Sequence, residues 1–155
     1  MPRRCRGFTL LELMIVLVLI GVLMGMVSFA TGSSPARQAR QEAVAFAGLI
    51  RQLREQAVLD GQEHGVRLSD AGYRAMRLGA RGWEPLSRVY PWPDALLARL
   101  SSDGYPVSLG AEHGPPQLLM LSSDESSSFS LTFESHGKTW SRVAADGLGE
   151  VRVDD

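Results

Sequence analysis

Residues 8–30, FTLLELMIVLVLIGVLMGMVSFA, decide the fold of this chain. A helix of about 23 residues, rising about 1.5 Å per residue, is long enough to span the roughly 30 Å hydrocarbon core of a bilayer. Its Leu, Ile, Val and Phe residues favour insertion by about 0.3–0.6 kcal/mol each, which outweighs a single acid, Glu12, costing at most about 3 kcal/mol. The stretch therefore predicts a transmembrane helix.

Basic residues fix the predicted orientation of this span. Arg3, Arg4 and Arg6 precede it, so the positive-inside rule keeps the N-terminus cytoplasmic and exports the rest of the chain. An ordinary signal peptide has the same charge order but is cut after its apolar run, and the small residues in 28–34 leave that interpretation open. Cys5 lies before the apolar run, whereas a lipidated cysteine would follow it, so we expect no lipidation.

Glu12 is the exception within the apolar stretch, because a carboxylate inside such a helix is costly and usually has a partner. In one interpretation its side chain snorkels to the lipid headgroups. In the one we favour, cleavage before Phe8 creates a new α-amino group, and Glu12 of one subunit pairs with that amine on a neighbour. At low dielectric such a pair is strong and sets the axial register of packed helices.

Residues 7–12, GFTLLE, lie between a basic leader and the apolar run, and this arrangement resembles the processing site of type IV pilins and type II secretion pseudopilins. The resemblance implies that a prepilin peptidase cuts between Gly7 and Phe8 and methylates the Phe8 amine. Cys5 would leave with the leader, and a cysteine-free mature chain cannot mispair disulfides in an oxidising periplasm.

The predicted helix continues after an interruption at residues 32–35, GSSP. We expect a kink or loosened turn there, although Ser34 before Pro35 also fits an N-cap followed by proline at the first helical position. Apolar residues then recur at spacings of three and four, which predicts an amphipathic helix to about Leu59, ended by Asp60-Gly61. The stripe consists of Ala36, Ala39, Ala43, Phe46, Ala47, Ile50, Leu53 and Ala57.

The rest of the chain has the short alternating runs typical of antiparallel strands. The first group is predicted at residues 66–68, 73–78 and 83–88, with a hairpin turn at 70–72. Residues 89–116, rich in Pro and Gly, are expected to form a long irregular connection, within which 96–100 fits a short helix or a strand. A second group is predicted at residues 117–121, 129–134, 138–144 and 150–153, with the last turn at Asp146-Gly147 and Gly149.

The predicted fold class is α+β and pilin-like, with a long N-terminal helix, its first half transmembrane, packed on an antiparallel β-sheet head. The 155 residues suit one modest domain plus this N-terminal segment. The predicted organisation is a cleaved leader (1–7), a transmembrane assembly helix (8–30), its amphipathic continuation (31–60) and a periplasmic β-rich head (61–155).

The order of elements also resembles the H-type minor pseudopilin of the type II secretion system. Local matches are QARQEA at 38–43, DAGY at 70–73, GWEPL at 82–86 and the closing residues 140–151. Where that family commonly has a Pro-Ser-Gly turn between two late strands, this chain has SSDES at 122–126, which leaves the shape of this loop open.

By this resemblance, the subunit joins other minor and major pseudopilins near the tip of a short periplasmic pseudopilus that exports folded proteins across the outer membrane. Its other implied partners are the prepilin peptidase, the inner-membrane assembly platform and inner-membrane lipid. A Walker A loop is not found in the sequence, so the chain is not the motor.

Enzymatic and cofactor-dependent functions are not indicated. His64, His113 and His136 lie far apart in the sequence without zinc-ligand spacing, and we expect them on the surface or in loops. The serines at 126–128 lack a nucleophile-elbow pattern. We therefore predict no catalytic residue, cofactor or metal, and the charge pattern gives no nucleic-acid surface.

Two further groups of residues have competing interpretations. Asp124-Glu125 and Asp154-Asp155 carry the carboxylates that calcium prefers, but without EF-hand spacing we expect a solvated acidic face and a frayed tail. Trp83, Tyr90 and Trp92 fit either a contact patch or core packing.

Two alternative functions stay open. A minor pilin of a type IV pilus would share the N-terminus and differ in its partners. A membrane-anchored periplasmic binding or catalytic domain would use the span as a simple anchor, and it predicts no cleavage at Gly7 and tolerance of Glu12→Leu.

Overall fold

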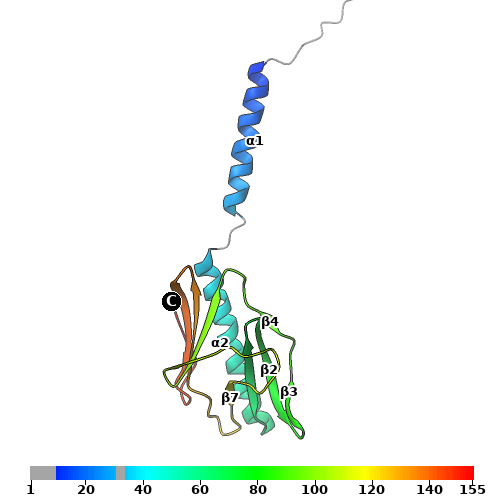
Figure 1. Ribbon diagram of the computed structural model, residues 1–155, viewed down its shortest axis with the longest axis vertical. Coiled ribbons are helices and arrows are strands. Elements are labelled where there is room, and N and C mark those ends of the chain that lie inside the picture. The colour runs from blue at the N-terminus through cyan, green and yellow to red at the C-terminus, as the bar shows by residue number, and fades with distance from the viewer. Residues whose placement is uncertain (1–9, 31–33) are drawn as a thin grey trace, which may run out of the picture. The chain divides into compact units, whose positions relative to one another are not determined.

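The computed structural model describes residues 10–30 and 34–155, with side chains for 10–22 and 34–155 (Figure 1). The chain divides into two compact units, Met1–Ser34 and Pro35–Asp155. The predicted leader, residues 1–7, and most of the predicted interruption, residues 31–33, lie outside the described residues.

The first unit contains one helix, α1 (Leu10–Ala30). From Leu10 to Val22 its large apolar side chains are all exposed, the least exposed being Val16 at 42%. Helix α1 therefore has no core of its own within the described residues. Over the residues whose side chains are described, no helix has the length and apolar character needed to cross a membrane.

The second unit begins with α2 (Pro35–Asp60). Proline suits the first helical position because its fixed φ is helical and the N–H it lacks would have no partner there. Gly61 ends the helix with a φ of 62°, in the left-handed region that favours glycine, and the Gln62 N–H bonds to the Ala57 carbonyl at 3.3 Å. The predicted apolar stripe is confirmed: all of it is buried except Ala36, which is half-buried.

The first sheet has five strands, in the order β3-β2-β1-β7, with β4 also paired to β2. The predicted hairpin is confirmed, since β1 and β2 are antiparallel and Ser69 pairs with Gly72 across the turn. The predicted third strand is present but ends at Pro85 rather than at residue 88. The strands of this sheet are β1 (His64–Ser69), β2 (Gly72–Gly79), β3 (Gly82–Pro85), β4 (Tyr90–Pro91) and β7 (Leu118–Met120).

The second sheet also has five strands, in the order β10-β9-β8-β5-β6. All its neighbouring pairs are antiparallel. The strands are β5 (Leu97–Ser102), β6 (Tyr105–Val107), β8 (Phe129–Ser135), β9 (Lys138–Ala145) and β10 (Arg152–Asp154).

The expectation of an irregular connection over residues 89–116 is wrong in part, because β4, β5 and β6 lie within it. Of the two alternatives for residues 96–100, the strand is present, as β5. In β5 the buried Ala98 and Leu100 alternate with the exposed Leu97 and Arg99, as in a half-buried strand. Asp103 and Gly104 have φ values of 51° and 83°, and they form the two-residue turn to β6. The Pro and Gly residues mark turns between strands here, rather than a structureless segment.

One strand that was expected in the second group, at residues 117–121, belongs instead to the first sheet. Strand β7 pairs with β1 in the first sheet, with Gly65 opposite Leu119. Strand pairing depends on contacts distant in sequence, so local alternation predicted that 117–121 was a strand but not which sheet it would join.

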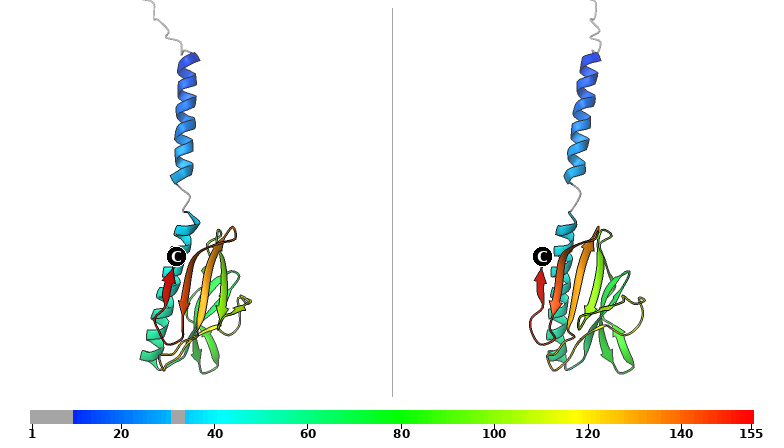
Figure 2. Two further views of the ribbon diagram at one scale, coloured as in Figure 1. Left: turned by 90° about the vertical axis from the view of Figure 1, so that its left-hand side faces the viewer. Right: turned by 60° about the vertical axis from the view of Figure 1, so that its left-hand side comes forward.

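The core lies between α2 and the two sheets, and Figure 2 shows the helix running along both of them. The ring of Phe46 meets Tyr73 of the first sheet at 5.1 Å and Phe129 of the second at 6.1 Å, both edge-on. Trp92 is partly buried and packs against this core, with its ring 5.8 Å from that of Phe133. Of the predicted aromatic patch, Tyr90 is exposed and Trp83 is half-buried.

Candidate assembly segment and head groove

The predicted processing residues Gly7 and Phe8 lie outside the described residues, while Glu12 lies in the first turn of α1. The neighbouring Leu11 and Leu13 are 69% and 56% exposed, so the carboxylate sits on a helix whose described surface is apolar on every side. A carboxylate is favoured at a helix N-terminus by the unsatisfied N–H groups of the first turn. A helix that is apolar all round needs lipid or other helices to cover it.

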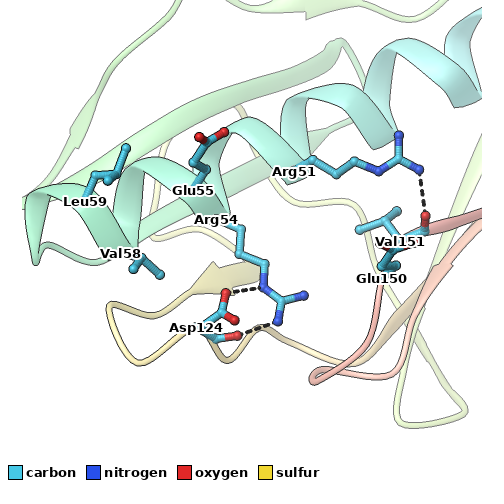
Figure 3. A pocket seen from close by; sticks show the side chains of 8 residues that line it. All are labelled: Arg51, Arg54, Glu55, Val58, Leu59, Asp124, Glu150 and Val151. Carbon is cyan, nitrogen blue, oxygen red and sulfur yellow. Dashed lines mark hydrogen bonds and ion pairs between the residues drawn. The ribbon is translucent and has the colours of Figure 1, made fainter.

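The head carries a groove of about 430 Å³ beside the C-terminal half of α2 (Figure 3). Arg51, Arg54, Glu55, Val58 and Leu59 line it from the helix. The loop between β7 and β8 and the loop between β9 and β10 line the opposite side, through Asp124, Glu150 and Val151.

Arg54 holds both loops to the helix. Its Nε donates to Asp124 Oδ1 at 2.8 Å, and its Nη2 donates to the Asp124 carbonyl at 2.7 Å. Its guanidinium also donates to the carbonyls of Gly149 at 2.7 Å and Leu148 at 3.0 Å. Arg51 adds one bond, from Nη2 to the Val151 carbonyl at 2.8 Å. One guanidinium thus satisfies four acceptors on two loops far apart in sequence.

Asp146 shapes the second of these loops. Its Oδ1 accepts the N–H of Gly149 at 2.6 Å and that of Leu148 at 3.2 Å. These two bonds hold the pKa of the Asp146 carboxyl below its usual range, with Arg152 acting in the same direction. The turn leaves the Leu148 and Gly149 carbonyls in reach of Arg54.

Asp124 and Glu125 are exposed, in agreement with the predicted solvated acidic face, but the contacts of Asp124 and of the predicted frayed tail were not expected. Asp124 is ion-paired with Arg54. Asp155 is ion-paired with Arg40, and the Ser141 hydroxyl donates to the Asp154 carbonyl at 3.1 Å. The arginines of α2 lie off the apolar stripe in the sequence, but this pattern carries no information about which distant loops they bind.

His64 corrects the prediction that the histidines lie on the surface or in loops. It is 2% exposed in β1, with Nδ1 at 3.1 Å from the Gln62 carbonyl oxygen. Burial follows from its place in a strand flanked on both sides, by β2 and β7. His113 and His136 are exposed outside the strands, as predicted. Within residues 10–30 and 34–155, no three His, Cys, Asp or Glu side chains are grouped to hold a metal ion.

Glu42 and Tyr73 form a polar contact at the edge of the core that the sequence did not reveal. Burial raises the pKa of the Glu42 carboxyl, and a hydrogen bond with the Tyr73 side chain partly offsets that rise. Burial and the nearby Glu42 carboxylate raise the pKa of Tyr73 as well. The contact joins α2 to β2 through a hydrogen bond, and the Tyr73 ring also packs on Phe46.

Two family descriptions match this chain. Residues 2–28 match the prokaryotic N-terminal methylation motif, which includes the predicted processing site and Glu12. Residues 42–149 match the type II transport protein GspH, a stretch that contains most of α2 and both sheets except β10.

Curated relatives agree over nearly the whole chain. The type II secretion system protein H of Pseudomonas aeruginosa is 38% identical, over 98% of this chain and 97% of that protein. The protein of the same name from Escherichia coli is 31% identical, over 85% of this chain and 82% of the relative.

Solved structures share the fold. The crystal structure of the minor pseudopilin EpsH of Vibrio cholerae superposes with a TM-score of 0.64 at 27% identity, over 75% of this chain and 92% of that one. The solution structure of E. coli GspH gives a TM-score of 0.63 at 22% identity, over 77% and 89% of the two chains, and supports the fold. The α+β pilin-like fold is thereby confirmed, and the chain belongs to the GspH family of type II transport proteins, the H-type minor pseudopilins.

Proposed function

We propose that this chain is a minor subunit of the type II secretion pseudopilus that helps assemble its tip for export of folded proteins across the outer membrane. One observation carries the proposal: a near-complete match to type II secretion system protein H of P. aeruginosa, extending through the N-terminal methylation motif into the head. A simple membrane anchor would not require that motif.

The proposal includes the maturation of the chain. A prepilin peptidase removes residues 1–7 by cutting between Gly7 and Phe8, and the new Phe8 amine is methylated. The mature chain is held in the inner membrane by residues 8–30, with its head, residues 61–155, in the periplasm. The exposed apolar side chains of α1 support this role, because they need lipid or other helices as cover.

Glu12 is the proposed assembly residue. Its carboxylate would pair with the Phe8 amine of a neighbouring subunit and fix the axial register of the packed helices. The alternative partner in a membrane is water at the headgroups, which gives no register. In this role the chain catalyses no reaction. Its proposed partners are other pseudopilins, the prepilin peptidase, the assembly platform and membrane lipid.

A complementation experiment tests the function. A strain lacking this gene should retain secreted proteins in the periplasm, and the wild-type gene should restore their appearance in the medium. Restored secretion without an effect on surface pili or twitching supports the pseudopilin role. Normal secretion in the deletion strain, with loss of pili, would instead favour a minor pilin of a type IV pilus.

A further inference from the structure

Two arginines face each other on the outer side of the first sheet. Arg67 of β1 is directly opposite Arg74 of β2. Side chains alternate along a strand, so the neighbouring Tyr73, which meets Phe46 of α2, points to the core, and Arg74 points away from it. Like charges directly opposite each other across a sheet are destabilising, so this pair needs a compensating contact.

Residues 110–116, here called the outer loop, supply part of that compensation. Arg67 donates to the Ala111 carbonyl from Nε at 3.1 Å and from Nη2 at 2.8 Å, and to the Pro115 carbonyl from Nη1 at 2.8 Å. Arg74 donates from Nη2 to the Glu112 carbonyl at 2.5 Å. The two guanidinium groups hold the outer loop over the sheet.

Backbone carbonyls satisfy donors but do not neutralise charge. None of the ion pairs among the described residues includes Arg67 or Arg74, so neither has a carboxylate oxygen within 4.0 Å. The Nε of Arg74 is also buried without a hydrogen-bond partner. Two positive charges therefore lie on directly opposite strand positions, and among the described residues neither forms an ion pair.

A groove of about 480 Å³ opens between the outer loop and the sheet, with Arg74 in its lining. In register, Met76 is opposite Pro85 of β3, and Leu78 is opposite Trp83. Apolar and aromatic side chains thus lie beside a guanidinium that forms no ion pair among the described residues, and such a surface suits an acidic segment with an apolar anchor. The residues that line this outer-sheet groove are Arg74, Met76, Trp83, Pro85, His113, Gly114 and Pro115.

We infer that the outer-sheet groove receives an acidic loop from the head of a neighbouring pseudopilin, with a carboxylate on Arg74 and an apolar side chain against Trp83. This inference rests on the proposed function. Seven residues line this groove, whereas a standard interface has about 20–30 residues on each side, so the groove alone would bind a freely diffusing protein weakly. Subunits held together by their N-terminal helices have a high effective concentration, which makes such a contact productive.

The open side of the groove suits this partner. Helix α2 covers the inner side of the sheet through Phe46 and Tyr73, so packing of helices in a filament leaves the outer side free. The contact would then add head-to-head specificity to an assembly whose main contacts are made by helices.

Site-specific photocrosslinking in secreting cells tests the inference. A photoreactive residue at Leu78, which is 39% exposed beside Trp83, should give an adduct with another pseudopilin. The same probe at Leu97, 54% exposed on β5 of the other sheet, is the matched control and should give far less of that adduct. A charged hydrogen bond of about 1.5–3 kcal/mol implies that Arg74→Gln lowers the Leu78 adduct about tenfold or more.

Two further variants separate charge from folding. Arg74→Lys keeps the charge and should retain most of the adduct, while Arg142→Gln removes an equal charge from β9 and should leave it unchanged. Protease resistance of the head, measured in each strain, shows whether the outer loop stays folded. An adduct with an exported protein, or equal losses for Arg74→Gln and Arg142→Gln, would overturn the inference.

The intact mass of the chain in the same cells distinguishes failure of the groove inference from failure of the proposed function. If the chain is processed and secretion is normal, yet Leu78 gives no pseudopilin adduct, the groove inference fails and the proposed function stands. If the chain keeps residues 1–7 while secretion continues, the proposed function fails and the groove inference fails with it.

Discussion

The two helices of this chain are similar in length and opposite in what covers them. Helix α1 has 21 residues, and its large apolar side chains from Leu10 to Val22 are exposed. Helix α2 has 26 residues and buries one apolar stripe against the two sheets of the head. The difference is one of pattern: α1 is apolar all round, whereas α2 is apolar on one side.

The comparison shows where each helix finds its stabilising contacts. Apolar area on α2 is removed from water by the folding of this chain alone, at about 25 cal/mol per Å². The same kind of area on α1 must be covered by lipid or by other subunits. Changes in α2 should therefore alter the stability of the head, and changes in α1 should alter assembly.

The largest effect is expected for Glu12→Leu in α1. Loss of the proposed pair with a neighbour's Phe8 amine should abolish secretion, while the unfolding midpoint of the head should not move. The measurement is enzyme activity of a secreted protein in the medium, together with urea denaturation of the detergent-solubilised chain. Glu55→Leu makes the same exchange at an exposed position of α2 and should keep secretion. Secretion at the wild-type level with Glu12→Leu would contradict the assembly role.

Phe46→Ala should give the opposite result on α2. The ring is fully buried between Tyr73 and Phe129, and removing it should lower the free energy of unfolding of the head by about 3–5 kcal/mol. Urea denaturation followed by tryptophan fluorescence measures this. Leu17→Ala in α1, where the side chain is 60% exposed, should leave that free energy unchanged. Equal losses of unfolding free energy for Phe46→Ala and Leu17→Ala would contradict the proposed difference between the two helices.

A smaller effect is expected for Arg54→Ala, which removes the bonds that hold two loops to α2. The expected loss is about 2–3 kcal/mol in unfolding free energy, with faster amide exchange in residues 121–126 and 146–150. Arg51→Ala removes a single bond to Val151 and should cost about 1 kcal/mol. If Arg54→Ala and Arg51→Ala lower the unfolding free energy by the same amount, Arg54 is not the main residue that joins the two loops to the helix.

The smallest expected effect is a pH dependence at Glu42. A carboxyl with a raised pKa in the folded head binds its proton more tightly there than in the unfolded chain. The stability that the folded head gains from this tighter proton binding is fully present below the ordinary pKa of 4.5. It is lost as the pH rises through the raised pKa of the folded state. The wild-type head should therefore lose stability relative to Glu42→Gln between about pH 4 and pH 7.

Thermal unfolding of the two proteins across that range checks the sign. The pKa of Asp146 is lowered, so that group acts in the opposite direction, and it is present in both proteins. A wild-type chain that gains stability over the Gln variant as pH rises would refute the effect of burial on Glu42.

Local patterns predicted the parts of the fold that depend on neighbouring residues. The apolar stripe of α2 and the hairpin predicted at residues 66–78 follow from spacings of three to four and from a tight turn, and both are present. Strand β5 was one of two alternatives at residues 96–100, because the prolines and glycines around it obscured its alternation. Asp103-Gly104, a strong hairpin signal, marked its end.

The features that depend on distant contacts were not predictable in this way. Pairing of β7 with β1, burial of His64, and the reach of Arg54 to two loops each depend on which segments meet in space. Arg67 and Arg74 are ordinary strand residues in the sequence, and only the register of β1 and β2 places them opposite each other. The processing residues Gly7 and Phe8, predicted from a compact motif, stay a prediction.

The intact mass of the membrane-extracted chain, from cells with and without a prepilin peptidase, tests the central claim most directly. The account predicts a peptidase-dependent loss of residues 1–7 together with the gain of one methyl group. An unchanged mass in both strains would make the apolar segment a simple anchor and would contradict the proposed role of this chain in a pseudopilus.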